Sequence, residues 1–135
     1  MALSTAPNKG RLYTALGTGA VVVGGLAYIG LGDPHRPGFF LPCPFHAATG
    51  WWCPGCGGLR MMHDVLHLDL SAAVVDNVVA LIGLPLLLAW ILVRRRSGRP
   101  WMTPVAGIVI VVIAITWTVV RNLPGFPLVP TVLDG

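Results

Sequence analysis

The chain has 135 residues, of which 55% are hydrophobic and only 10% carry a charge, and its mean hydropathy is +0.76. A soluble domain has about 25% charged residues, and a chain of this length cannot hide so much apolar surface from water. The composition therefore excludes an ordinary soluble globular domain and predicts an integral membrane protein that lies in a lipid bilayer. No soluble substrate is inferred from it.

Three apolar blocks each have about the 20 residues that cross a hydrocarbon core of about 30 Å. Because backbone groups in lipid must satisfy their own hydrogen bonds, each block is expected to be a helix. The predicted fold is all-α integral membrane, with three transmembrane helices, a short interfacial helix and a Cys-bearing extracytoplasmic loop. The expected segments are an N-tail (1–11), a first span (12–32), the Cys loop (33–57), an interfacial amphipathic helix (58–70), a second span (71–93), an Arg-rich hairpin (94–100), a third span (101–120) and a Pro-rich tail (121–135).

The basic residues set the expected orientation. Lys9 and Arg11 precede the first span, and four arginines lie in the hairpin at 94–100. The positive-inside rule then places the N-terminus and this hairpin in the cytoplasm, and the Cys loop and the C-terminus outside. Topology and attraction to anionic headgroups account for the arginines, so nucleic acid is not expected as a partner.

All three cysteines lie in the predicted extracytoplasmic loop, as Cys43 and the pair Cys53-Pro54-Gly55-Cys56. In zinc knuckles such a C-x-x-C turn points two thiolates at one metal ion. A structural zinc held by Cys43, Cys53 and Cys56 would need a fourth ligand, for which the sequence offers His46, His35 or His63. The same spacing serves thiol oxidoreductases, in which a helix N-terminus activates one sulfur.

A structural disulfide is the third interpretation of these cysteines. Cysteines outside the cytoplasm tend to oxidise. A bridge from Cys43 to Cys53 or to Cys56 would close a loop of about 11 to 14 residues and contribute roughly 3 kcal/mol in the chain-entropy model. The three interpretations remain open at the level of the sequence.

After Gly57, apolar residues recur at three- and four-residue spacing, which predicts the short amphipathic helix. Asp69 has the chemistry of an N-cap for the second span, and Pro85 predicts a kink inside that span. His63 and His67 have the spacing of a zinc protease motif, but the residue between them that would act as base is Asp64 in place of glutamate. A metalloprotease is therefore not favoured.

The residues from Cys43 to Arg60 resemble a family of small bacterial membrane proteins defined only as a domain of unknown function (number 2752). Its signature is C-P-x5-T-G-x-x-C-P-x-C-G-x-x-R, and the resemblance covers about residues 42–77. Leu68-Asp69 stands where that family usually has Gly-Asp. The resemblance implies a multi-pass protein of the bacterial cytoplasmic membrane, with Gly50, Gly57, Arg60 and Asp69 in structural or interaction roles. It implies no activity, substrate or cofactor.

Two classes of function are therefore expected. The first is a non-enzymatic accessory or assembly subunit of a larger respiratory or transport complex, with other membrane protein subunits as partners, and it is favoured because no catalytic constellation is evident. The second is an extracytoplasmic thiol-disulfide or metal-handling protein that uses Cys53 and Cys56.

Overall fold

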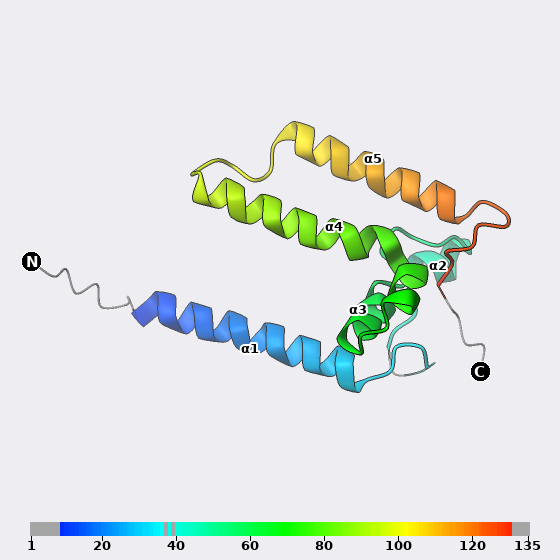
Figure 1. Cartoon of the computed structure of the whole chain (residues 1–135), viewed down its shortest axis with the longest axis horizontal. Coiled ribbons are helices and arrows are strands. Elements are labelled where there is room, and N and C mark those ends of the chain that lie inside the picture. Colours follow the sequence, from blue (N-terminus) through cyan, green and yellow to red (C-terminus); the bar gives the residue numbers. More distant parts are fainter. Residues whose placement is uncertain (1–8, 37, 39, 131–135) are drawn as a thin grey trace, which may run out of the picture.

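The computed structural model describes residues 9–36, 38 and 40–130 (Figure 1). These residues form five helices and no β-strand, which confirms the all-α class. The helices are α1 (Lys9–Leu31), α2 (Pro44–Thr49), α3 (Gly58–Leu66), α4 (Leu70–Arg96) and α5 (Pro104–Arg121). Parts of the expected N-tail (1–8) and C-terminal tail (131–135) lie outside the described residues.

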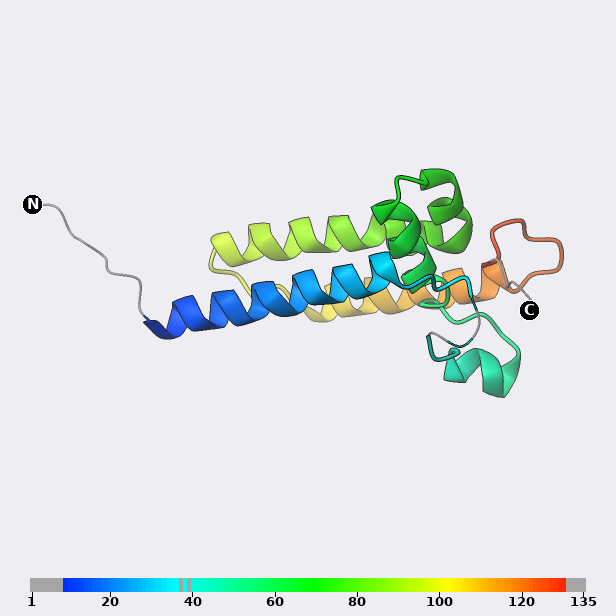
Figure 2. The ribbon, with the colours of Figure 1, turned by 90° about the horizontal axis from the view of Figure 1, so that it is seen from below.

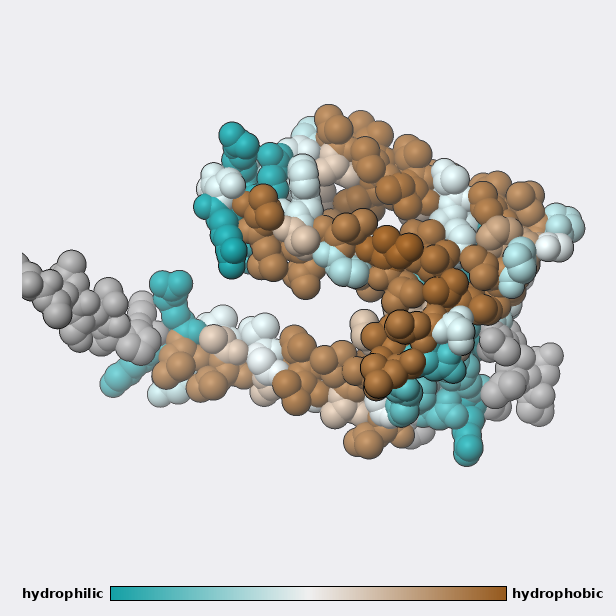
Figure 3. Space-filling view, in the orientation of Figure 1, coloured by the Kyte–Doolittle hydropathy of each residue, from teal (hydrophilic) through white to brown (hydrophobic). Residues whose placement is uncertain are grey.

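Helices α1, α4 and α5 are the three that are long and apolar enough to cross a membrane, as the sequence predicted. In both views they run along the longest axis of the molecule, while α2 and α3 gather at one end (Figures 1 and 2). Apolar side chains cover their middles, and hydrophilic residues gather toward the two ends (Figure 3). This banding is that of a membrane protein.

The long helices make little contact with one another. Helix α3 packs on α4, and α1 packs on α3, whereas no other pair of helices among the described residues makes more than a marginal approach. No residue of α1 is buried, and 17% and 11% of the apolar windows of α4 and α5 are buried. Most of the apolar surface of the spans is therefore left for lipid or for other protein helices.

Helix α4 begins where the sequence predicted and bends where it did not. The Asp69 carboxylate accepts a hydrogen bond from the backbone N–H of Ala72 (3.1 Å), which caps the first turn. The non-helical backbone inside α4 is at Asn77 (φ −166°, ψ 82°) and not at Pro85, where the kink was expected. The Asn77 side-chain oxygen accepts from the N–H of Ala80 (3.0 Å), so it caps the part of the helix that follows the break.

The core of the molecule lies at the end where α2 and α3 gather, and it is unusually polar. Its buried apolar residues are Cys56, Met61, Ala73 and Trp117, and its buried polar or charged residues are Asp64, Asp76, Asn77 and Arg121. Buried charges are tolerated only where hydrogen bonds or opposite charges satisfy them. The partners of these four polar side chains are therefore what organises this end of the protein.

Candidate functional site

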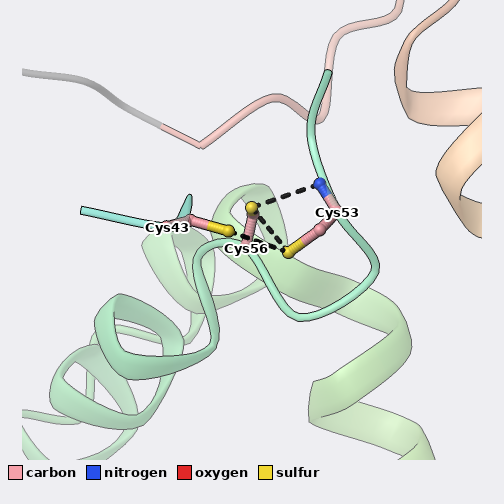
Figure 4. A group of neighbouring side chains, drawn as sticks. All are labelled: Cys43, Cys53 and Cys56. Atoms are coloured by element: carbon pink, nitrogen blue, oxygen red, sulfur yellow. Dashed lines mark hydrogen bonds between the residues drawn. The ribbon is translucent and has the colours of Figure 1, made fainter. Parts of the chain in front are cut away.

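The three cysteines come together in space (Figure 4). Their sulfur atoms all lie within 4.8 Å of one another, with Cys53 Sγ 2.7 Å from Cys56 Sγ and 3.4 Å from Cys43 Sγ. A disulfide requires about 2.05 Å, so the three are free thiols in this structure. We call Cys43, Cys53 and Cys56 the thiol cluster.

Two short turns bring the sulfurs together. Cys43 is the residue before α2, whose first residue is Pro44, and Gly50 ends that helix in the left-handed conformation (φ 72°). Between Cys53 and Cys56 the chain makes a tight turn, with the N–H of Cys56 donating to the carbonyl of Cys53 (3.1 Å). The N–H of Cys53 points to the sulfur of Cys56 (3.2 Å), which is the amide-to-sulfur contact that stabilises thiolates.

Arg121, the last residue of α5, is hydrogen-bonded to this turn. Its side chain is 1% exposed, and its guanidinium donates to the carbonyls of Cys56 (2.8 Å) and Cys53 (3.2 Å) and, on α4, of Asp76 (2.9 Å). It also lies over the ring of Trp117, 5.1 Å from the ring centre. The planar, forked guanidinium suits such a multiple contact, which ties three segments of the chain together.

Asn77 provides a second attachment for the turn. It is fully buried, and its side-chain amide donates to the carbonyls of Pro54 (3.0 Å) and Cys56 (3.2 Å). The break in α4 at this residue leaves a polar side chain free to reach the cysteine loop while its own oxygen caps the following turn. The carbonyl of Cys56 thus accepts from both Asn77 and Arg121.

Asn122 and the tail also contact the cysteine loop. The Asn122 side chain exchanges two hydrogen bonds with the backbone of Trp52, both 2.9 Å long, as a neighbouring β-strand would. Pro130, which is buried, approaches Gly57. Residues 122 and 130 of the Pro-rich tail thus both contact the protein's own loop.

Gly57 lies at the closest approach between the loop and α4. Its φ is +80°, a left-handed conformation that side chains disfavour, and a Cβ built on it would lie 2.4 Å from the carbonyl oxygen of Asp76. Only glycine fits this position without moving the backbone of α3 away from α4. The glycine of the predicted signature is thus needed for packing.

The environment of the thiols makes them unequal. Burial, together with hydrogen bonds to Cys53 and Cys43, raises the pKa of Cys56 to about 12. Burial also acts to raise the pKa of Cys43, but the backbone N–H of His46 and the two neighbouring thiols oppose it, and the net effect lowers this pKa. Because the thiolate is the reactive form, Cys43 is the more nucleophilic of these two.

Alkylation kinetics test this difference. At pH 8 a thiol with a pKa of about 12 is thiolate in roughly one molecule in ten thousand, so we expect iodoacetamide to modify Cys43 at least about tenfold faster than Cys56. Peptide mass spectrometry of the folded protein at successive times measures both rates. Denatured protein is the control, in which the two rates should become similar. Equal rates in the folded protein would contradict the geometry described here.

The thiol cluster borders an open hollow of about 570 Å³. Cys43, Cys53 and Cys56 line it together with His46 and Arg60. Cys43 and Cys53 are half-buried, whereas Cys56 is 6% exposed. A metal ion, a reagent or a partner's side chain can therefore reach the sulfurs from this hollow.

The cluster fits a metal ion in its chemistry and in part in its ligand number. Three sulfurs that converge on one point are a common set of zinc ligands, and tetrahedral zinc requires a fourth. His46, the expected fourth ligand, is stacked on Trp52 with ring centres 4.0 Å apart, and it does not join the group of atoms within 4.8 Å. Its Nδ1 is buried without a hydrogen bond, so this ring nitrogen has no other assigned role.

The other candidate residues lie elsewhere. Arg60 donates from Nε to the carbonyl of Pro34 (3.2 Å) and so links α3 to the loop after α1. His63 Nδ1 donates to the carbonyl of Ile29 (2.7 Å), and His67 Nδ1 donates to that of His63 (2.8 Å). Backbone carbonyls therefore occupy one nitrogen of each of these histidines.

Sequence reasoning missed the three residues that hold the cysteine loop: Asn77, Arg121 and Asn122. The sequence does carry one indication of a role for Arg121. It is a charged residue at the end of an apolar helix, at the end opposite to the arginines of residues 94–100. Asn77, a polar residue in the early turns of an apolar helix, carried a similar signal.

Comparison with known proteins finds a match to an uncharacterised family over part of the chain. The family model described as "Protein of unknown function (DUF2752)" matches residues 43–91, which span the thiol cluster, α3 and most of α4. No curated protein and no solved structure matches the chain. Four residues separate Pro44 from Thr49 in this sequence, one fewer than in the signature that the resemblance suggested.

Proposed function

We propose that this protein is a small, non-enzymatic multi-pass subunit that accompanies a larger bacterial membrane complex, respiratory or transport, or assists its assembly. The observation that carries the proposal is the construction of the thiol cluster. Its loop is bonded to α4 and α5 through the buried side chains of Asn77 and Arg121. A loop fixed in this way is a rigid cap, suited to docking on another protein.

The membrane helices support a role within an assembly. Helix α1 buries none of its residues, and α4 and α5 leave most of their apolar side chains exposed. Lipid alone can cover such surfaces, but helices of other membrane subunits would add van der Waals packing, which is the main attraction between helices in a bilayer. We infer that the long helices pack against partner subunits.

In this proposal the cap faces away from the cytoplasm. Lys9 and Arg11 belong to the first turn of α1, and three of the arginines end α4. The start of α1 and the end of α4 lie at the end of the molecule opposite to α2 and α3 (Figure 1). The positive-inside rule assigns that basic end to the cytoplasm of a bacterial cell. The cysteines then lie in a compartment where thiols oxidise or bind metal.

A cross-link through the thiols, which we call the staple, completes the cap. Zinc would be held by Cys43, Cys53 and Cys56, with water, His46 after a ring movement or a partner residue as fourth ligand, and it would act as a cross-link. A disulfide from Cys43 to Cys53 or to Cys56 is the other form of the staple. Both join α2 to the turn before α3.

Native co-purification with the Cys56→Ser variant tests the function. For an accessory subunit, we expect the wild-type chain to recover a stoichiometric partner, and Cys56→Ser to lower the recovered amount of both by at least about fivefold, because losing a staple costs about 2–5 kcal/mol. Native electrophoresis with quantitative mass spectrometry measures this. Ser97→Ala, at the far end of α4, is the control. A folded wild-type chain without any partner would contradict the proposal.

A second function is favoured by the open hollow beside the thiols. Cys43 and Cys53 are accessible there, which suits exchange of a disulfide or transfer of a metal ion to a client. In that case Cys56→Ser would leave a stably folded protein without exchange activity. Counting free thiols and bound zinc in the purified protein by mass spectrometry separates a disulfide, a metal site and free thiols.

A further inference from the structure

A second group of potential ligands lies apart from the thiol cluster. His35 from the loop after α1, Asp64 from α3 and Asp76 from α4 have ligand atoms within 4.8 Å of one another. His35 Nε2 is 3.2 Å from Asp76 Oδ2 and 3.6 Å from Asp64 Oδ1. Three segments that are distant in sequence thus meet at one imidazole nitrogen.

Asp33 orients the imidazole of His35 through the other ring nitrogen, Nδ1. Its Oδ1 accepts from the backbone N–H of His35 (3.0 Å) and lies 3.2 Å from His35 Nδ1. A carboxylate oxygen at this distance accepts a hydrogen bond, so Asp33 favours the tautomer of His35 that carries its proton on Nδ1. The Nδ1 atom therefore carries the proton, and a neutral His35 presents the lone pair of Nε2 to the two other carboxylates.

With His35 neutral and both carboxylates ionised, such an arrangement calls for a cation at its centre. The lone pair of Nε2 and the oxygens of Asp64 and Asp76 would repel one another if nothing lay between them. Asp76 and Asp64 are buried, with side chains 1% and 7% exposed, so water cannot screen this repulsion. The Oδ2 atom of Asp64 is buried without a hydrogen-bond partner, as expected of an oxygen that binds a metal ion.

We propose that His35 Nε2, Asp64 and Asp76 bind a divalent transition-metal ion, with Asp33 as the positioning residue behind the histidine. Oxygen or nitrogen ligands at about 2.0–2.2 Å from a metal ion in tetrahedral geometry lie roughly 3.3–3.6 Å apart. The two distances from His35 Nε2, 3.2 and 3.6 Å, are close to that range. A carboxylate that bonds the other nitrogen of a ligating histidine is the usual support in metal sites.

The ligand set distinguishes this site from the thiol cluster. One imidazole and two carboxylates suit Mn²⁺, Fe²⁺ or Zn²⁺, whereas three thiolates select softer ions and bind Mn²⁺ poorly. Mn²⁺ is therefore the probe that reports on the His35 site alone. The ion would link α3, α4 and the loop after α1, beside the attachment of the cysteine loop to Asp76 and Asn77.

Electron paramagnetic resonance of the full-length protein in detergent, titrated with Mn²⁺ alone, tests the proposal. We expect one bound Mn²⁺ per chain, with spin-echo modulation from one imidazole nitrogen. Asp64→Asn should weaken binding at least about a hundredfold and Asp33→Asn about tenfold. His35→Gln should remove the nitrogen signal. The controls are Asp69→Asn, which keeps a cap residue, and Cys53→Ser, and both should bind Mn²⁺ as the wild type does.

Two results would overturn the metal site. One is a wild-type protein that binds no Mn²⁺, in which case His35 is held between the carboxylates as a protonated imidazolium. The other is binding that neither Asp64→Asn nor His35→Gln weakens. Circular dichroism checks that the variants fold, and His35→Gln keeps the test valid if Asp64→Asn does not. The His35 site and the thiol cluster share no residue, and Cys53→Ser checks that they are independent. Failure of the metal site therefore leaves the proposed role of the thiol cluster untouched.

Discussion

Replacing Arg121 by methionine is expected to destabilise the protein by roughly 3–5 kcal/mol, the scale measured when one partner of a buried charged interaction is removed. The guanidinium donates to three backbone carbonyls, of Cys53, Cys56 and Asp76, and methionine fills the volume without donating to any of them. Each hydrogen bond from a charged donor is worth about 1.5–3 kcal/mol. The loss is partly offset because the Cys56 carbonyl still accepts from Asn77 and the Cys53 carbonyl from the N–H of Cys56. Thermal or denaturant unfolding in detergent measures the loss.

Two further variants identify the cause. Arg121→Lys keeps the positive charge but cannot bond three carbonyls in one plane, so an intermediate loss is expected. Arg36→Met removes an exposed arginine at the same end of the molecule, which pairs with Asp33, and it should change stability by less than about 1 kcal/mol. In Arg121→Met we also expect Cys56 to become open to alkylation. Wild-type stability in this variant would show that the loop is held by other contacts.

Replacing Gly57 by alanine is the second change with a large expected effect. The left-handed φ of +80° costs a residue with a Cβ about 1–2 kcal/mol. The added Cβ would also lie 2.4 Å from the carbonyl oxygen of Asp76, and both groups belong to backbone that cannot rotate away. We expect α3 to separate from α4, with a total loss of roughly 3 kcal/mol or more.

Gly58→Ala is the matched control for that variant. Gly58 is the next residue, and a Cβ on it meets nothing within 4 Å. It begins α3, where alanine is a better helix former than glycine, so stability should stay equal or rise slightly. Unfolding curves of the two variants side by side measure the difference. Similar losses for both would mean that the contact between Gly57 and α4 is not a determinant of the fold.

The local features of this protein were predictable because each depends on neighbours in sequence. Helix α4 begins at its Asp69 cap, and helix α5 begins at Pro104 behind the Thr103 side chain, which accepts from Ala106. The short amphipathic helix was expected over 58–70 and is formed over Gly58–Leu66. The break in α4 at Asn77 was not expected, because Asn77 contacts the distant cysteine loop; the kink expected at Pro85 brings no non-helical residue with it.

The sites were predictable only in part, for the same reason. The C-x-x-C spacing indicated that Cys53 and Cys56 face each other, but the role of Arg121 depends on hydrogen bonds that cross 45 to 68 residues of sequence. His35 was considered as a fourth metal ligand beside the three thiols. The structure places it between Asp64 and Asp76 instead. No pattern along the chain marks which distant backbone carbonyl a buried side chain will reach.

By itself, then, the sequence determined that three apolar helices are long enough to cross a bilayer and that the cysteines share one loop, because hydropathy, capping and charge asymmetry act over a few residues at a time. The tertiary structure alone decided which polar side chains are buried with the cysteines and which gather around His35. Buried polar groups must find partners wherever the packing of helices places them, and that packing is a property of the whole chain.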